Sequence, residues 1–255
     1  MRFASIGSGS SGNGLVVEVG RTRVLVDCGF SLSETRARLT RIGLAPEDLD
    51  AVLVTHEHSD HVGGVARLAI KHDLPVWCTH GTLVNWRMQT DNLPWTEVID
   101  SHRSFSIGAL EILPFPVPHD AREPVQFVFS DGQRKLGVLT DTGHITSHIA
   151  ASLSGVNALV LECNHDADML ESGPYPPSLR RRVGGQYGHL ENRQAASLLG
   201  QMDVSGLRHV VAAHLSQKNN KPSLARAALA SVLNCEPEWI NVACQEQGFD
   251  WRCIE

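Results

Sequence analysis

A short histidine-rich segment holds the strongest chemical signal in this sequence. Residues 55–61 read THEHSDH, so three histidines and one aspartate occur within six residues. Imidazole nitrogens and carboxylate oxygens together suit zinc, iron or manganese. A helix cannot turn all four side chains toward one point at this spacing, but a loop between a strand and a helix can. The segment therefore predicts a metal-binding loop rather than a solvent-exposed turn.

The elements on either side of this segment agree with such a loop. Residues 50–55 (DAVLVT) form a short continuous apolar run, which indicates a strand buried on both faces. A helical pattern over 62–72 follows the segment directly. Upstream, apolar runs at 15–19 and 22–27 are joined by a Gly-Arg pair, which predicts a hairpin.

The alternation of strands and helices continues to the end of the chain. The remaining predicted strands are residues 75–79, 109–115, 125–129, 135–140, 158–162, 209–213, 239–243 and 249–253. The remaining predicted helices are residues 32–42, 83–89, 145–153, 192–202 and 224–233. The segment 166–188 carries Gly, Pro and three consecutive arginines, and we predict it to be irregular. No linker divides the chain, so we expect one domain over residues 1–255, with ligand-binding residues at strand ends.

The overall composition is that of a globular protein. The 255 residues are 42% hydrophobic and 20% charged, which excludes a mainly disordered or coiled-coil chain. A net charge of −6 argues against a protein whose whole surface binds nucleic acid, but it allows a local basic groove. No apolar run approaches the roughly 18–20 residues that cross a bilayer, and the N-terminus lacks the features of a signal peptide. We therefore expect a cytoplasmic protein without a membrane segment; the sequence carries no signal for oligomeric state.

The order of further acidic and imidazole residues resembles a known family. Asp27 ends an early strand, and three residues follow the histidine segment in order: His119 in PVPHD, Asp141 in LTDTG and His214 in VAAHLS. With the histidine segment, this pattern resembles the metallo-β-lactamase superfamily over nearly the whole chain. The resemblance implies an α/β protein with a four-layer αββα sandwich and the activity of a metal-dependent hydrolase.

Three shorter segments narrow the resemblance to one branch. Residues 7–13 read GSGSSGN, residues 162–166 read ECNHD and residues 188–192 read GHLEN. These segments are similar to the YycJ/WalJ branch, whose members are described as metal-dependent phosphodiesterases or 5′-to-3′ DNA exonucleases. The resemblance therefore implies a nucleic-acid substrate, most specifically DNA.

The resemblance also implies a centre with two divalent metal ions, zinc or manganese, while iron is accepted by the same ligands. The ligands of one ion would be His56, His58 and His119, and those of the other would be Asp60, His61 and His214, with Asp141 bridging the two. Asp27 would orient the metal-binding loop from outside the ligand set. Two ions lower the pKa of a water molecule held between them, which makes it a nucleophile near neutral pH. Asp60 and the other ligands would thus be catalytic, because they hold the ions that activate this water.

Further residues are candidates for contacts with the substrate. His189, and less strongly His165, would bind the scissile phosphate or protonate the leaving oxygen. Ser10 and Asn13, with Ser8 and Ser11, would donate hydrogen bonds to phosphate or to the metal loop; a tight Gly/Ser turn is the alternative.

A basic stretch provides candidates for the DNA backbone. Residues 180–221 contain seven basic and two acidic side chains, among them Arg180, Arg181 and Arg182. An arc of this charge would suit a polyphosphate, and Tyr187 would stack on a base. The alternative is an ordinary solvated run of charges.

The ligand set by itself predicts hydrolysis but leaves the substrate open. A small-molecule hydrolase, such as a cyclic phosphodiesterase, thioesterase or lactonase, remains the alternative to a DNA exonuclease. The β-lactam-cleaving relatives usually carry a cysteine near the position of Asp141, so the aspartate disfavours that activity. A flavodiiron-type redox protein is disfavoured because the chain offers no flavin-binding domain.

Overall fold

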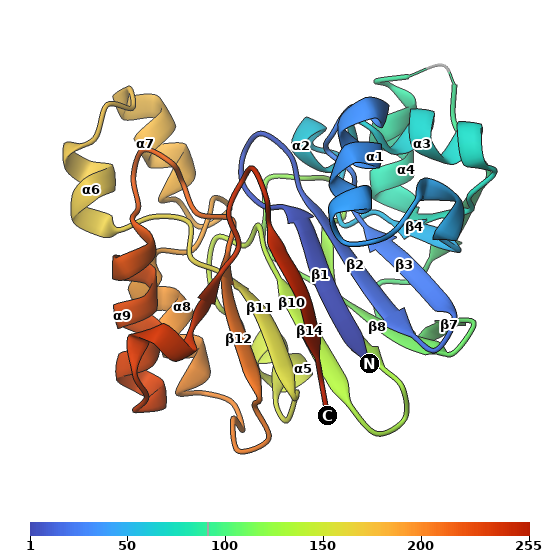
Figure 1. The fold of residues 1–255 in the computed structure, drawn as a ribbon. Coiled ribbons are helices and arrows are strands. Elements are labelled where there is room, and N and C mark those ends of the chain that lie inside the picture. Colours follow the sequence, from blue (N-terminus) through green and yellow to red (C-terminus); the bar gives the residue numbers. More distant parts are fainter. Residues whose placement is uncertain (91) are drawn as a thin grey trace.

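The computed structural model describes residues 1–90 and 92–255, which form two mixed sheets of seven strands each (Figure 1). The first sheet, in the order β14-β1-β2-β3-β4-β5-β6, contains β14 (Phe249–Cys253), β1 (Arg2–Gly7), β2 (Gly14–Val19), β3 (Thr22–Val26), β4 (Ala51–Leu53), β5 (Val76–Thr79) and β6 (Thr96–Ile99). The second, in the order β13-β12-β11-β10-β9-β8-β7, contains β13 (Asn241–Val242), β12 (His209–Ala213), β11 (Ala158–Glu162), β10 (Lys135–Leu139), β9 (Val125–Ser130), β8 (Leu110–Pro116) and β7 (Phe105–Ile107).

Helices cover the outer face of each sheet. On the first sheet lie α1 (Leu32–Arg41), α2 (Ser59–Val62), α3 (Val65–His72) and α4 (His80–Arg87) (Figure 1). On the second lie α5 (Ser147–Leu153), α8 (Asn192–Leu199) and α9 (Pro222–Leu233), while α6 (Ala167–Ser172) and α7 (Pro177–Val183) lie beyond the ends of its strands (Figure 1).

Three clusters of buried side chains separate these layers. Phe3 and Phe127 belong to a cluster shared by strands of both sheets. Leu39 of α1 and Leu68 of α3 belong to a second cluster, and Leu198 of α8 belongs to a third. Each sheet therefore buries one face on the other sheet and one face on helices, which confirms the predicted four-layer αββα sandwich. That one domain spans residues 1–255 stays a prediction.

Most predicted elements near the histidine segment are present. The hairpin is β2 paired with β3 in antiparallel register, with Val19 opposite Thr22. The helix predicted over 62–72 is instead two helices, α2 and α3, separated by two glycines. A Cβ atom at Gly64 would lie 1.8 Å from the carbonyl oxygen of Phe30, so the chain at this point approaches too closely for any side chain. Strands β1, β6 and β7 are additional to the prediction.

The prediction of an irregular segment over 166–188 is wrong, because the segment contains α6 and α7. The Asp166 side chain accepts a hydrogen bond from the Met169 amide and so caps α6. Pro177 stands at the first position of α7, where a missing amide hydrogen costs nothing. Both helices are too short for a sequence pattern to reveal. None of the seven residues of α7 is buried.

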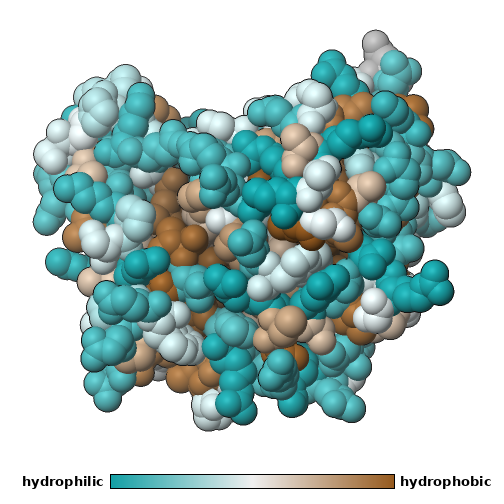
Figure 2. All heavy atoms as spheres, viewed as in Figure 1, coloured by the Kyte–Doolittle hydropathy of each residue, from teal (hydrophilic) through white to brown (hydrophobic). Residues whose placement is uncertain are grey.

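The loops that carry the candidate metal ligands lie at one edge of the sandwich. Strands β3 and β4 are parallel neighbours in the first sheet, and β10, β11 and β12 are parallel in the second, so their carboxyl ends lie at the same edge. In Figure 2 the outline is indented at this edge, between the part formed by α6 and α7 and the part formed by α1 to α4. Among the described residues, no helix is long and apolar enough to cross a membrane.

Candidate active site

Three site residues hold an unusual backbone conformation within two residues of the end of a strand. Asp27, Asp141 and His214 follow β3, β10 and β12, and their φ angles are 59°, 53° and 55°. This left-handed region is unfavourable for residues other than glycine, at roughly 1–3 kcal/mol each. The surrounding structure enforces the conformation at three positions around one point, which marks that point as a functional centre.

The first candidate metal cluster joins two loops. The Nε2 atom of His56 lies 3.1 Å from the Nδ1 atom of His58, and that atom lies 3.3 Å from the Nε2 atom of His119. Ligand nitrogens at the usual distance from zinc are about 3.3 Å apart in a tetrahedral arrangement. The three imidazoles predicted to share one ion therefore converge at a suitable spacing.

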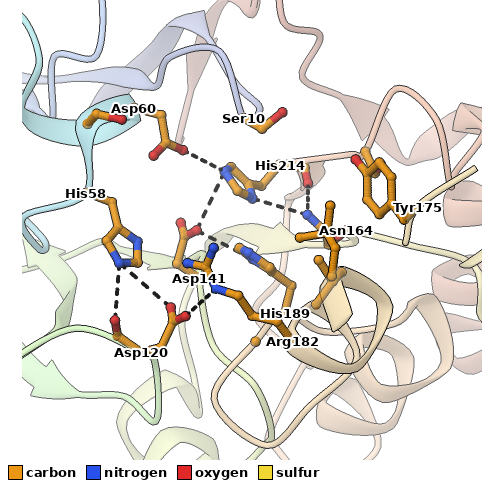
Figure 3. Close-up of a pocket in the computed structure, with 15 residues that line it drawn as sticks. Ser10, His58, Asp60, Asp120, Asp141, Asn164, Tyr175, Arg182, His189 and His214 are labelled. Carbon is orange, nitrogen blue, oxygen red and sulfur yellow. Dashed lines mark hydrogen bonds and ion pairs between the residues drawn. The ribbon is translucent and has the colours of Figure 1, made fainter. Parts of the chain in front are cut away.

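The second candidate cluster contains the predicted remaining ligands. Asp60 Oδ2 lies 3.4 Å from His61 Nε2 and 3.6 Å from His214 Nε2. The Asp141 carboxylate also reaches both histidines. Its Oδ2 lies 3.4 Å from His61 Nε2. Its Oδ1 lies 3.6 Å from His214 Nε2 (Figure 3). Asp141 Oδ2 and His214 Nε2 are buried without a hydrogen-bond partner among the described residues. A bound cation would satisfy both atoms, so the donor set fits a divalent metal ion.

The other ring nitrogen of each histidine in these clusters is held by an oxygen atom. The pairs are His56 Nδ1 with Thr55 Oγ1 (3.0 Å), His58 Nε2 with the Asp120 carbonyl (3.2 Å), His61 Nδ1 with Asp27 Oδ2 (2.8 Å), His119 Nδ1 with the Gly188 carbonyl (3.0 Å) and His214 Nδ1 with Glu162 Oε1 (3.3 Å). A ring nitrogen that donates its proton to such an oxygen leaves the opposite nitrogen free as a ligand. Asp27 also accepts hydrogen bonds from the Thr55 amide and hydroxyl at 2.9 Å and 2.8 Å, so it holds the residue that precedes His56.

The electrostatics of the second cluster favour positive charge. Burial opposes protonation of His214, but Asp141, Asp60 and Glu162 outweigh it and raise the pKa of His214 to about 10. The pKa of His61 is raised in the same way, against burial, by Asp141, Asp27 and Asp60. In the first cluster, burial lowers the pKa of His56, and the neighbouring imidazoles lower it further. Protons and a cation therefore compete for the second cluster.

Glu162 connects the second cluster to His189 and has no role in the sequence-based site. It is fully buried, and its Oε2 accepts hydrogen bonds from the amides of Thr142 and Leu190, both at 3.1 Å. Its Oε1 lies 2.8 Å from His189 Nδ1 and 3.3 Å from His214 Nδ1. Burial opposes the charge of Glu162, but both histidines hold its pKa below the usual range. The available signal was its place at the end of a buried strand, within the ECNHD segment.

A cleft of about 340 Å³ opens above these clusters (Figure 3). Its lining contains three of the residues predicted for substrate contacts: Ser10, Arg182 and His189. The lining also contains Asp120, Asn164, Tyr175 and Ser216, which the sequence did not single out. Arg182 Nε lies 2.6 Å from Asp120 Oδ2, so this arginine is held at the edge of the first cluster.

Other residues predicted for substrate contacts do not line this cleft. The side-chain nitrogen Nδ2 of Asn13 lies 3.3 Å from Asp60 Oδ2 and 3.1 Å from His61 Nε2, so Asn13 helps to position two side chains of the metal-binding segment. Ser8 Oγ similarly accepts the His214 amide at 2.9 Å. His165 lines a different cavity, and burial lowers its pKa to about 4.

Two arginines and one tyrosine also lie outside the cleft lining. Arg180 and Arg181 line the cavity that contains His165, on the other side of α7. Tyr187 is 61% exposed, and its carbonyl accepts a hydrogen bond from the Asp120 amide. Arg208 of the predicted basic arc precedes β12, at the opposite end of that strand from His214.

Comparison with known proteins identifies the family. The family described as "Beta-lactamase superfamily domain" matches residues 22–215. The chain is 38% identical to exodeoxyribonuclease YycJ of Bacillus anthracis and 32% identical to exodeoxyribonuclease WalJ of Streptococcus pneumoniae, over 91% of this chain and 89% and 88% of those proteins. The crystal structure of the metallo-beta-lactamase fold protein YhfI from Bacillus subtilis has a TM-score of 0.77 at 18% identity, covering 98% of each chain. The chain belongs to the beta-lactamase superfamily and has the metallo-β-lactamase fold.

Proposed function

We propose that this protein is a dinuclear metal-dependent phosphodiesterase that acts on DNA as a 5′-to-3′ exonuclease. The observation that carries the proposal is the convergence of two metal-ligand clusters in one cleft, with Arg182 at its edge. His56, His58 and His119 would hold one ion, and Asp60, His61 and His214 the other. Asp141 would bridge them, because one of its carboxylate oxygens lies within 4.8 Å of ligand atoms of both His56 and His61. Zinc and manganese both suit this set of nitrogen and oxygen ligands.

The chain's own residues divide the work of hydrolysis. When bound, two divalent ions activate a water molecule and neutralise charge on the scissile phosphate. Arg182 is positioned to bind a phosphate oxygen, because its side chain is 62% exposed and its partner Asp120 is at the cleft edge. Asn164, whose side chain binds the His214 carbonyl at 3.0 Å, keeps that ligand loop in place.

His189 is the proposed proton donor to the leaving oxygen. Its Nδ1 atom is held by Glu162, which leaves Nε2 for the cleft that the residue lines. Burial opposes protonation, but Glu162 and Asp141 raise the pKa of His189 above its ordinary value, which favours the protonated ring. This role passes to His189 rather than His165, because His165 lines a different cavity.

DNA is the proposed substrate because two relatives that cover most of this chain are named exodeoxyribonucleases. The basic side chain at the cleft supports a polyanionic substrate. The cytoplasmic location expected from the sequence stays a prediction.

The test compares three substrates in one assay. Protein reconstituted with zinc or manganese is incubated with 5′-phosphorylated duplex DNA, single-stranded RNA and a thioester. We expect stepwise release of nucleotides from the 5′ end of DNA. Faster hydrolysis of the thioester, with intact DNA, would replace the proposal with a small-molecule hydrolase. Faster hydrolysis of RNA would keep the phosphodiesterase and change the substrate.

A further inference from the structure

One helix beside the metal clusters carries half-buried apolar side chains that face the cleft. Leu179 and Val183 of α7 are four residues apart, so they share one side of this helix, and Tyr175 lies two residues before the helix begins. All three line the cleft, and all three are only partly buried. Because none of the residues of α7 is buried, this apolar side does not serve the core.

The apolar side chains stand next to the residues proposed for phosphate chemistry. The same cleft is lined by His189, His214 and Asp141 (Figure 3). Arg182 belongs to α7 itself, so one short helix presents both a cation and an apolar surface to one cleft. The volume of about 340 Å³ falls within the roughly 300–1,000 Å³ of pockets that bind small organic groups.

A further basic residue accompanies the aromatic ring. Lys218 Nζ lies 5.9 Å from the centroid of the Tyr175 ring. Ser10 and Ser216 add hydroxyl groups to the lining. The surroundings thus combine an aromatic ring, two aliphatic side chains, positive charge and neutral hydrogen-bonding groups.

We propose that Tyr175, Leu179 and Val183 form a shelf that receives the nucleobase next to the scissile phosphate. The inference rests on the proposed function and specifies its substrate as a phosphodiester that carries a nucleoside. A base has a flat apolar face for the ring and aliphatic chains, while its phosphate is charged and belongs beside Arg182. Stacking of this kind accepts any base, since every base presents a π-face.

The experiment uses two single-stranded oligonucleotides that differ at one position. Both carry a 5′-phosphate; one has thymidine as the 5′-terminal nucleotide and the other has a tetrahydrofuran abasic residue there. The metal-loaded protein should cleave the first with roughly 10-fold higher kcat/KM, the size expected for one stacked base. Tyr175→Ala should remove this preference by raising KM for the base-bearing substrate, without loss of metal, and Tyr175→Phe should keep the preference.

The chain offers a matched control in its other tyrosine. Tyr187 is exposed and does not line the cleft, so Tyr187→Ala should keep the full preference. Equal cleavage of both oligonucleotides by the unaltered protein would overturn the shelf and leave the exonuclease standing, as would a Tyr175→Ala variant that keeps the preference. Failure to cleave either oligonucleotide, with the metals bound, would overturn the proposed function itself.

Discussion

At this site, one ring nitrogen of a histidine is fixed by a hydrogen bond while the other faces the candidate metal position. His61 shows the principle: Asp27 holds its Nδ1 atom at 2.8 Å, and its Nε2 atom faces Asp60 and Asp141, each at 3.4 Å. An imidazole that is fixed in this way needs no reorganisation to bind an ion, which raises the affinity of the site. The same reasoning makes Glu162 important, because it fixes a candidate ligand and the candidate proton donor together.

Removal of the bridging carboxylate should affect both ions. Asp141→Ala should lose activity and retain fewer than the two ions per chain that we expect in the unaltered protein, because the Asp141 carboxylate lies within 4.8 Å of ligand atoms of both His56 and His61. Elemental analysis after reconstitution with excess metal and desalting measures this. Asp203, an exposed aspartate, provides the control in Asp203→Ala. One ion or none in the unaltered protein would refute the two-ion centre.

Removal of His189 should reduce turnover without removing metal. General acid catalysis contributes roughly 10²- to 10⁴-fold, so His189→Ala should lose that factor on DNA. A p-nitrophenyl phosphodiester has a leaving group that needs no proton, so the rate of its hydrolysis should fall far less in the variant. The ratio of variant to unaltered rates on the two substrates is the measurement, with His148→Ala on α5 as control. Equal losses would indicate phosphate binding instead of proton donation, and no loss would remove His189 from the mechanism.

At the scale of elements, the metal-ligand candidates lie in segments that follow strands, and α7 supplies part of the cleft wall. The ligands follow strands whose ends are fixed by the sheet registers, for example Leu161 of β11 opposite Ala212 of β12. Helix α7 lies outside the sandwich layers and buries no side chain (Figure 1). The rigid part of the protein thus holds the candidate catalytic groups, and a lightly packed helix lies where the substrate would enter.

The position of α7 predicts which arginine contacts the DNA backbone. The sequence alone makes Arg180, Arg181 and Arg182 equal candidates for contacts with the DNA backbone. The structure assigns the contact to Arg182, so Arg182→Ala should reduce the slope of log K against log salt by about 0.7 for single-stranded DNA. Arg180→Ala and Arg181→Ala should leave the slope unchanged, because both side chains line the other side of α7. Fluorescence anisotropy at several salt concentrations measures the slopes; equal effects of all three variants would contradict this assignment.

At the scale of the whole molecule, the candidate centre lies across the seam between the two sheets. Asp27 and the loop 56–61 come from the first sheet, and Asp141 and His214 come from the second. Bound ions would therefore join the two halves of the sandwich as well as serve catalysis. Ligands that bind only the folded state stabilise it by mass action, so the metals should raise the unfolding temperature.

Removal of the metals should lower the unfolding temperature by a larger amount as the pH rises. In the metal-free protein, burial opposes protonation of His214. The nearby carboxylates outweigh it and raise the pKa of His214 to about 10, above the unfolded value of about 6.5. The stability from this group is fully present below about pH 6.5 and is lost as the pH rises toward 10. Protons also compete less with the metal at higher pH. Calorimetry with and without a chelator should show a difference in unfolding temperature that widens from pH 6 to pH 9; a constant or narrowing difference would contradict the assignment of His214 as a ligand.

The sequence by itself determined the fold class and the candidate metal ligands. The THEHSDH segment could be predicted as a metal site from its own spacing and from the strand before it, because its four ligand-type residues lie within six positions. His119, Asp141 and His214 were found because each follows a strand in the family order. Tertiary structure alone decided that Glu162 joins His189 to His214, that Tyr175 rather than Tyr187 lines the cleft, and that only one of three consecutive arginines reaches it. The physical reason is that neighbours along a helix point in different directions, and the direction that meets the substrate depends on how α7 packs against loops more than 30 residues away in the chain.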